Sequence, residues 1–138
     1  MKKKIFTVVS ASFISALMIT GCSKKADTPA YTKDQLVGTY VMTALTSGST
    51  NVFDTFDDCE KDNLQILNSD LTYDIVDAGE QCEPSSDESG PWSVSGNKLT
   101  LDGQTFTIES LTAHQLIVSG NVPIGTGTAS VRATYAKE

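Results

Sequence analysis

From residue 38 onward, apolar and polar residues alternate in short runs separated by turn sequences. A period of two is typical of strands with one buried face and one wet face, as in antiparallel sheets. The pattern predicts an all-β domain of about eight short strands with almost no helix. The strands are expected around residues 40–45, 64–66, 71–75, 92–94, 99–101, 106–108, 116–118 and 130–136.

The turns between these runs indicate sequential hairpins. Asn68-Ser69-Asp70 and Ser95-Gly96-Asn97 are turn sequences, and Asp102-Gly103 is among the strongest two-residue hairpin signals. Sequential hairpins favour an antiparallel up-and-down meander that closes on itself into a barrel, because closure removes exposed sheet edges. A two-sheet β-sandwich is the alternative architecture. A capping box from Thr32 to Gln35 predicts one short helical turn before the first strand.

The first 22 residues have a different pattern. Three lysines precede an apolar run from Ile5 to Ile19, which is the layout of a secretory signal peptide and is short for a membrane span. Ile19-Thr20-Gly21-Cys22 resembles a bacterial lipobox, which implies cleavage before Cys22 and diacylation of its thiol. We therefore predict a lipoprotein signal peptide over 1–21, an acylated N-terminus and flexible tether over 22–31, and one barrel domain over 32–138.

The charge balance narrows the range of partners. The formal net charge is −7, and loss of the three leader lysines makes it −10. Such a surface argues against nucleic acid, which needs Lys and Arg, and against electrostatic docking on anionic lipid. Membrane attachment is therefore expected through the acyl chains. We predict a lipid-anchored protein of the outer membrane, with the periplasmic side or the cell surface left open.

Several short motifs follow one another in a characteristic order and cover roughly residues 36–135. They are Leu36-Val37-Gly38-Thr39-Tyr40, Cys59-Glu60-Lys61-Asp62, Cys82, Gly90-Pro91-Trp92-Ser93-Val94 and IESLTAHQL at 108–116. This order resembles the small lipocalin-like lipoproteins of Bacteroidetes-type bacteria, which implies a lipocalin-like barrel. Tyr40 stands where that family usually has the tryptophan of Gly-x-Trp.

In lipocalins that tryptophan closes one end of the barrel, and an arginine from late in the chain covers it. The only arginine here is Arg132, in the last predicted strand. The resemblance therefore implies a stacking or cation–π contact between Tyr40 and Arg132 that closes the barrel end. The alternative is an exposed Arg132 on the polar face of its strand.

The cysteines predict one disulfide. If Cys22 is acylated, Cys59 and Cys82 are the remaining pair in an oxidising compartment, and a bridge between them would contribute about 3 kcal/mol. A zinc site is disfavoured because neither a CxxC motif nor a His pair accompanies the thiols. A reactive thiolate is also disfavoured, because the carboxylates around Cys59 would raise its pKa.

Carboxylates crowd the segment from 54 to 88, where Lys61 is the only base. A calcium site is the alternative to solvated loop charge, but the spacing and glycine of an EF-hand are missing. We therefore predict no metal and no cofactor. The best acidic cluster consists of Asp54, Asp57, Asp58, Glu60 and Asp62.

Catalysis is not expected, and we predict no catalytic residue. His114 is the only histidine and has no partner nucleophile for a hydrolase triad. The glycine-rich stretch GNVPIGTG at 120–127 lacks the lysine of a phosphate loop, so it is interpreted as a flexible connection between the last two strands.

Two functions remain. The first is a non-catalytic envelope lipoprotein whose barrel binds a small apolar ligand, although large inward residues slightly favour a filled interior. The alternative is a protein-interaction module, such as a periplasmic inhibitor or envelope-assembly partner, with a solid core and acidic loops at 54–58 and 83–90. The predicted ligand-lining residues are Tyr73, Ile75, Trp92, Val94, Leu99, Leu101, Phe106, Ile108, Leu116 and Val118.

Overall fold

A computed structural model describes residues 28–138, so the predicted signal peptide and Cys22 lie outside the described residues. Strands dominate the described chain, as the alternating pattern predicts. The elements are α1 (Lys33–Leu36), β1 (Gly38–Ser47), β2 (Thr50–Asn51), the 3-10 helix η1 (Phe53–Thr55), α2 (Asp58–Lys61), β3 (Leu64–Leu67), β4 (Thr72–Val76), β5 (Glu88–Ser95), β6 (Lys98–Leu101), β7 (Gln104–Leu111), β8 (Gln115–Ile124) and β9 (Gly127–Lys137).

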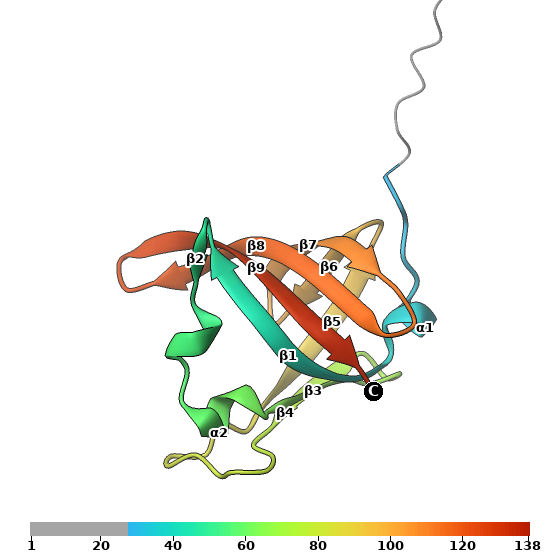
Figure 1. The fold of residues 1–138 in the computed structure, drawn as a ribbon. Coiled ribbons are helices and arrows are strands. Elements are labelled where there is room, and N and C mark those ends of the chain that lie inside the picture. Colours follow the sequence, from blue (N-terminus) through green and yellow to red (C-terminus); the bar gives the residue numbers. More distant parts are fainter. Residues whose placement is uncertain (1–27) are drawn as a thin grey trace, which may run out of the picture.

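β1 and β3 to β9 close into an antiparallel barrel (Figure 1). Each strand pairs with the next one along the chain, and β9 pairs back with β1 from Tyr40↔Lys137 to Ser47↔Val131. The predicted up-and-down barrel is therefore confirmed, and the two-sheet sandwich is wrong because the strand ladder is continuous around the barrel. β2 only forms a two-residue hairpin with the end of β1.

A register shift in β1 keeps its apolar side chains inside the barrel. The β1–β9 ladder is irregular between Met42 and Ala44, so that Met42 and Leu45, three residues apart, both line the interior. An extra residue in one strand bends the sheet and re-aims the following side chains. A second shift lies between Ile108 and Ser110, where β7 pairs with β8.

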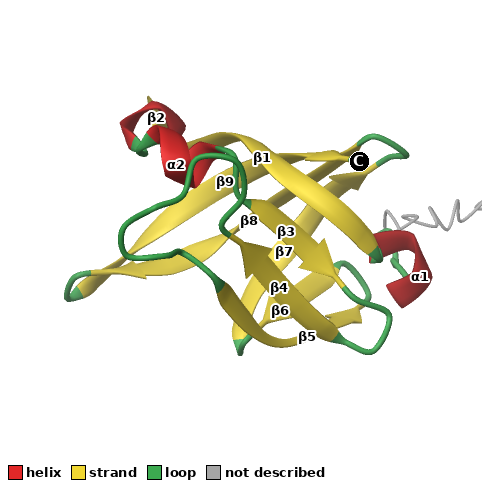
Figure 2. Cartoon of the chain, turned by 90° about the horizontal axis from the view of Figure 1, so that it is seen from below, coloured by secondary structure: helices red, strands yellow, loops and turns green. Residues whose placement is uncertain are grey.

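The two ends of the barrel carry different structures. The short helix α1 lies at one end, and η1 and α2 lie at the other (Figure 2). The second end also carries the loop at 77–87, between β4 and β5. We call the first the α1 end and the second the mouth. Within residues 28–138, no helix is both long enough and apolar enough to cross a membrane.

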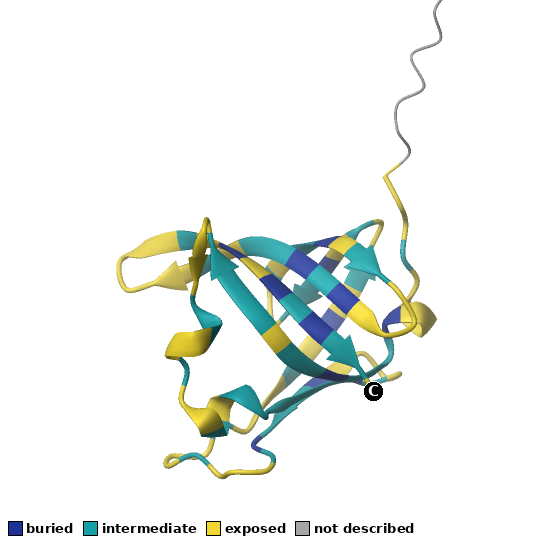
Figure 3. Ribbon diagram, in the orientation of Figure 1, coloured by how far each residue is buried: buried dark blue, intermediate teal, exposed yellow. Residues whose placement is uncertain are grey.

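Burial alternates along the longest strands, as Figure 3 shows. On β8, Leu116 and Val118 are buried, and on β9, Val131, Ala133 and Tyr135 are buried. The glycine-rich stretch at 120–127 belongs to this regular structure, because β8 runs to Ile124 and β9 begins at Gly127. The predicted flexible connection is therefore wrong. Gly125, with φ 58°, occupies the left-handed conformation that the hairpin tip requires.

Candidate functional site

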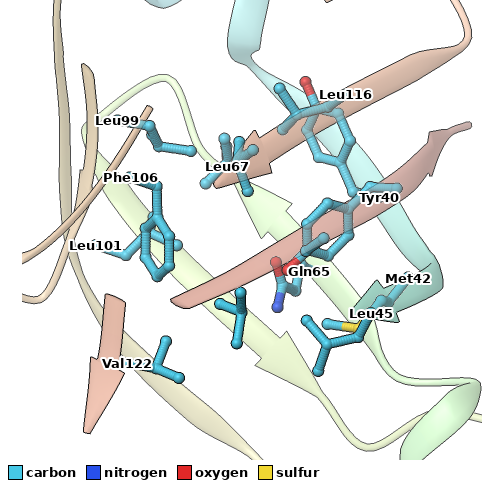
Figure 4. A pocket seen from close by; sticks show the side chains of 14 residues that line it. Tyr40, Met42, Leu45, Gln65, Leu67, Leu99, Leu101, Phe106, Leu116 and Val122 are labelled. Atoms are coloured by element: carbon cyan, nitrogen blue, oxygen red, sulfur yellow. The ribbon is translucent and has the colours of Figure 1, made fainter. Parts of the chain in front are cut away.

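The barrel interior is hollow beside β1, β8 and β9. A cavity of about 210 Å³ lies there, and Figure 4 shows its walls. Strands β3, β6 and β7 complete it. The lining residues are Tyr40, Met42, Leu45, Gln65, Leu67, Leu99, Leu101, Phe106, Leu116, Val118, Val122, Val131, Ala133 and Tyr135.

The opposite side of the interior, beside β4 and β5, is filled. Tyr73 and Trp92 are 6% and 2% exposed and belong to the buried core. Hydrogen bonds orient both rings, since Trp92 Nε1 donates to Asn68 O at 2.9 Å and Tyr73 Oη donates to Glu88 Oε1 at 2.8 Å. A tryptophan and a tyrosine held in this way occupy the space that a ligand would need.

The predicted lining residues therefore divide into two groups. Leu99, Leu101, Phe106, Leu116 and Val118 line the cavity, as predicted. The remaining five do not line this cavity, because they are core residues or pack against the core, although Ile75 also lines a second pocket described below. These are Tyr73, Ile75, Trp92, Val94 and Ile108.

Most of the walls that the sequence prediction missed come from the first and last strands, and the others are Gln65 and Leu67 of β3 and Val122 of β8. β1 contributes Tyr40, Met42 and Leu45, and β9 contributes residues that include Ala133 and Tyr135. These strands are adjacent only because β9 pairs with β1 to close the barrel. The sequence does contain a signal for this wall, because Val131, Ala133 and Tyr135 recur at every second position and so mark one apolar face of the last strand.

Three side chains bring polar atoms to the otherwise apolar lining: Tyr40, Gln65 and Tyr135. Burial raises the pKa of Tyr135 to about 12. Tyr135 is therefore uncharged at neutral pH. Among the described residues, those lining the cavity include no Asp, Glu, Lys, Arg or His. The interior can accept apolar groups and offers uncharged hydrogen-bonding groups at Gln65 and Tyr135.

Contacts around Tyr40 seal the α1 end. Tyr40 is 1% exposed, and its hydroxyl group donates to Leu36 O at 2.6 Å. Lys137 Nζ lies 5.5 Å from the centroid of the Tyr40 ring and donates to Gln35 O at 2.9 Å. Burial raises the pKa of Tyr40 to about 12. The phenol thus stays neutral and connects β1 to the end of α1.

The predicted Tyr40–Arg132 contact is wrong, because strand register places these residues apart. Arg132 pairs with Thr46, and the residue paired with Tyr40 is Lys137. Arg132 also alternates with the inward Val131 and Ala133, so its side chain is outside, where Nε donates to Glu109 Oε2 at 2.6 Å. A lysine from the last strand takes the position that the resemblance assigned to arginine.

At the mouth, the predicted disulfide between Cys59 and Cys82 is confirmed. The two Cα atoms are 5.3 Å apart, and the bridge links α2 to the 77–87 loop across 23 residues of sequence. Asp77, 5% exposed, holds the same loop by accepting hydrogen bonds from the Cys82 and Ser86 amides at 3.0 and 3.1 Å. A covalent bond and a buried carboxylate therefore fix the mouth together.

The acidic residues near Cys59 have structural roles. Asp57 and Glu60 form a capping box for α2, which the sequence pattern Asp-x-x-Glu could have indicated. Asp58 pairs with Lys61 at 3.0 Å, and Asp62 accepts from the Glu80 amide. In the part of the chain that the structure describes, no three His, Cys, Asp or Glu residues gather as a metal site.

Toward the mouth, the space beneath α2 is also hollow. A second pocket of about 160 Å³ shares Met42 and Gln65 with the first. Phe56, Glu60, Asn63 and Ile75 form the rest of its lining. The second pocket therefore lies next to the cavity and has more polar walls.

Comparison with known proteins agrees with this architecture. A family model for a lipocalin-like domain matches residues 36–118, more than half of the chain. The match begins at the last residue of α1 and ends within β8, so it includes most of the barrel. A search among curated proteins finds no match.

Proposed function

The chain belongs to the lipocalin-like domain family, and on this basis we propose that it binds a small apolar molecule inside its barrel. The cavity beside β1, β8 and β9 is the observation that carries the proposal. Its walls are hydrocarbon and aromatic apart from Gln65 and the hydroxyl groups of Tyr40 and Tyr135. An apolar ligand that moves from water into this uncharged cavity would bury its apolar surface. This transfer is favourable by roughly 25 cal/mol per Å² of apolar area buried.

The size of the cavity limits the ligand. A volume of about 210 Å³ exceeds the ~150 Å³ that suffices for benzene in an apolar protein cavity, and it is below the ~300 Å³ typical of drug-sized sites. A single ring or a short alkyl chain therefore suits the barrel itself. A longer molecule would need the second pocket beneath α2.

The protein-interaction alternative requires a solid core, and the cavity argues against it. The exposed apolar residue at the tip of the β8–β9 hairpin, Ile124, is 59% exposed, but it is isolated. Single exposed apolar side chains are common on proteins that bind nothing there. The binding proposal accounts for the cavity, and the interaction alternative does not.

We also propose that the protein is a lipid-anchored envelope protein that binds without catalysis. The lipobox-like sequence ending at Cys22 supports the anchor. Residues 23–30 would supply a tether of roughly 28 Å when extended, because Tyr31 is already attached to the barrel through a hydrogen bond to Gly96 O. Replacement of Cys22 by serine should move the protein from the membrane fraction to the soluble fraction and abolish palmitate labelling. Unchanged labelling would show that the thiol of Cys22 is not acylated.

Filling the cavity tests the binding proposal. Ala133→Leu adds three carbon atoms at a buried position in the cavity wall, whereas Ala136→Leu makes the same change on the outer face of the same strand. Wild type and Ala136→Leu should both take up toluene, seen as shifts of the cavity-lining methyl groups by NMR. Ala133→Leu should lose this response and remain folded.

Equal toluene binding by a folded Ala133→Leu variant would show that the ligand does not occupy this cavity. In a separate experiment, native mass spectrometry of protein purified from its own host should identify the physiological occupant. A retained small molecule is expected, and it should be missing from Ala133→Leu purified in the same way.

A further inference from the structure

Gln65 breaks the apolar pattern of the cavity wall from within its own strand. β3 has the sequence LQIL at 64–67, and its residues Gln65 and Leu67 line the cavity. Since successive side chains of a strand point to opposite faces, Leu64 and Ile66 lie on the outer face, and neither belongs to the packed core. The strand therefore turns an amide inward although an aliphatic residue flanks it on each side.

A second polar side chain lies inside the barrel on the other side of β1. Gln65 is opposite Tyr40 in the β1–β3 ladder, and Tyr135 is opposite Met42 in the β1–β9 ladder. Tyr40 and Met42 are two residues apart and both line the cavity, so Gln65 and Tyr135 share their inner face. Figure 4 shows the Gln65 amide among the side chains of this wall. We call Gln65 and Tyr135 the polar pair.

The polar pair has more hydrogen-bonding capacity than its own members can use. A glutamine side chain carries two N–H donors and a carbonyl acceptor, so a contact with one phenol leaves donors and an acceptor unused. The side-chain polar atoms that are both unpaired and inaccessible in residues 28–138 are Asp62 Oδ1 and Asn63 Oδ1, so the unused positions of the polar pair have accessible surface. The Tyr40 hydroxyl group, in contrast, already donates to Leu36 O.

The surroundings of the polar pair disfavour an ionised ligand group. Within residues 28–138, the cavity lining contains no charged side chain. A charge moved there from water would lose its hydration without gaining a counter-ion. A hydroxyl group avoids this cost, and it can donate to the Gln65 carbonyl while it accepts from an N–H of the same amide. A neutral hydroxyl group therefore matches the polar pair.

We infer that the ligand is a small neutral molecule with one hydroxyl group, which hydrogen-bonds the polar pair while a single ring or a short alkyl chain contacts the apolar walls. This inference rests on the proposed binding function and specifies the class of molecule bound. Gln65 is then a specificity residue, since it distinguishes a hydroxyl-bearing molecule from a hydrocarbon of the same shape. Apolar walls with a few placed polar groups are typical of sites that fix the orientation of a small ligand.

Three aromatic probes of similar size separate hydroxyl recognition from apolar uptake. Toluene has no polar group, p-cresol adds one neutral hydroxyl group, and benzoate is anionic at pH 7. In NMR titrations of the wild-type protein, p-cresol should shift the side-chain amide resonances of Gln65 more than toluene does. Benzoate should bind at least about tenfold more weakly than p-cresol.

A matched pair of variants isolates the contribution of the amide. Gln65→Met substitutes an apolar side chain of similar length, and Gln115→Met makes the same change at an exposed position of β8 outside the cavity. Gln65→Met should weaken p-cresol binding about three- to tenfold relative to toluene binding. Gln115→Met should leave the ratio of the two affinities unchanged. Tyr135→Phe is an independent variant, which keeps the ring and should weaken p-cresol about twofold relative to toluene.

The outcomes separate this inference from the proposed function. A p-cresol to toluene ratio that is unchanged in both Gln65→Met and Tyr135→Phe would overturn the inference, as would benzoate binding as tight as p-cresol. Persistent p-cresol binding by folded Ala133→Leu would also overturn it, because the hydroxyl contact would then lie outside the barrel, as in the second pocket that Gln65 borders. If toluene binds the wild-type protein and Ala133→Leu excludes it, the proposed function stands in each of these cases. If none of the three probes binds the wild-type protein, both fail.

Discussion

The two ends of the barrel are stabilised in different ways. At the α1 end, side chains from α1 and from the first and last strands pack around one buried ring, that of Tyr40. At the mouth, a disulfide and the buried Asp77 carboxylate hold a long loop against α2. The α1 end is therefore a continuation of the core, whereas the mouth is a polar surface that needs cross-linking.

This difference determines where a ligand can enter. A sealed aromatic end offers no polar groups to a passing molecule, because the ring hydroxyl and the lysine are already bonded to α1 backbone carbonyls. The mouth has a second pocket that shares Met42 and Gln65 with the cavity, and its helices η1 and α2 contain no fully buried residue. Elements with little buried apolar surface open most readily. The mouth is therefore the expected entrance.

Loss of the Tyr40 ring should have the largest effect. Tyr40→Ala removes a fully buried aromatic side chain at the α1 end and should lower the free energy of unfolding by about 3–5 kcal/mol, measured by urea denaturation. Tyr40→Phe is the control, because it removes only the hydrogen bond to Leu36 O and should cost about 1 kcal/mol. Equal losses in the two variants would show that the ring does not close this end.

Loss of the disulfide should have the next largest effect and should act at the other end. The double substitution Cys59→Ser/Cys82→Ser removes a cross-link between residues that are 23 positions apart in the sequence. It should lower the free energy of unfolding by about 3 kcal/mol. Hydrogen exchange should accelerate in α2 and in the 77–87 loop, with the α1 end unchanged. Faster exchange at both ends would show that the ends are not independent. Reduction of the wild-type protein should reproduce the effect without substitution.

The sequence predicted the regular part of this molecule well. All eight barrel strands were expected near their observed positions, because each hairpin depends on local turn residues such as Asp102-Gly103 and on a period-two pattern. The disulfide was also predictable, since few pairings were open to three cysteines. These features depend on residues close in sequence or on a small number of alternatives.

The interior could be predicted only in part. Alternation shows which residues face inward, but it does not distinguish the filled side at Trp92 from the hollow side at Ala133. That distinction depends on strand register around the closed barrel, including the shift after Met42. Register also explains the error at the α1 end, where Lys137 and not Arg132 is paired with Tyr40. The family resemblance predicted that a cation from the last strand covers the ring of Tyr40. Only the register of the closed β-ladder shows that this cation belongs to Lys137.

Substitutions of the two cationic residues of β9, Arg132 and Lys137, should have the smallest effects on the free energy of unfolding. Lys137→Met removes the cation above Tyr40 and should cost about 0.5–1 kcal/mol, whereas Arg132→Met removes an exposed ion pair with Glu109 and should cost a few tenths to 1 kcal/mol. Unfolding by urea at several pH values should separate them.

The pH dependence distinguishes the two variants because only one involves a carboxylate. The hydrogen bond from Arg132 holds the pKa of Glu109 below its ordinary value of 4.5. A lowered pKa in the folded state stabilises the protein above the ordinary pKa, and this contribution disappears as pH falls through the lower value. The cost of Arg132→Met should therefore fall on acidification below about pH 4.5 and vanish once Glu109 is protonated in the folded protein. The cost of Lys137→Met should persist over the same range, since the pKa of Tyr40 is about 12 and its ring stays neutral. A Lys137→Met cost that also vanished in acid would show that Lys137 acts through a carboxylate and not through the ring that closes the α1 end.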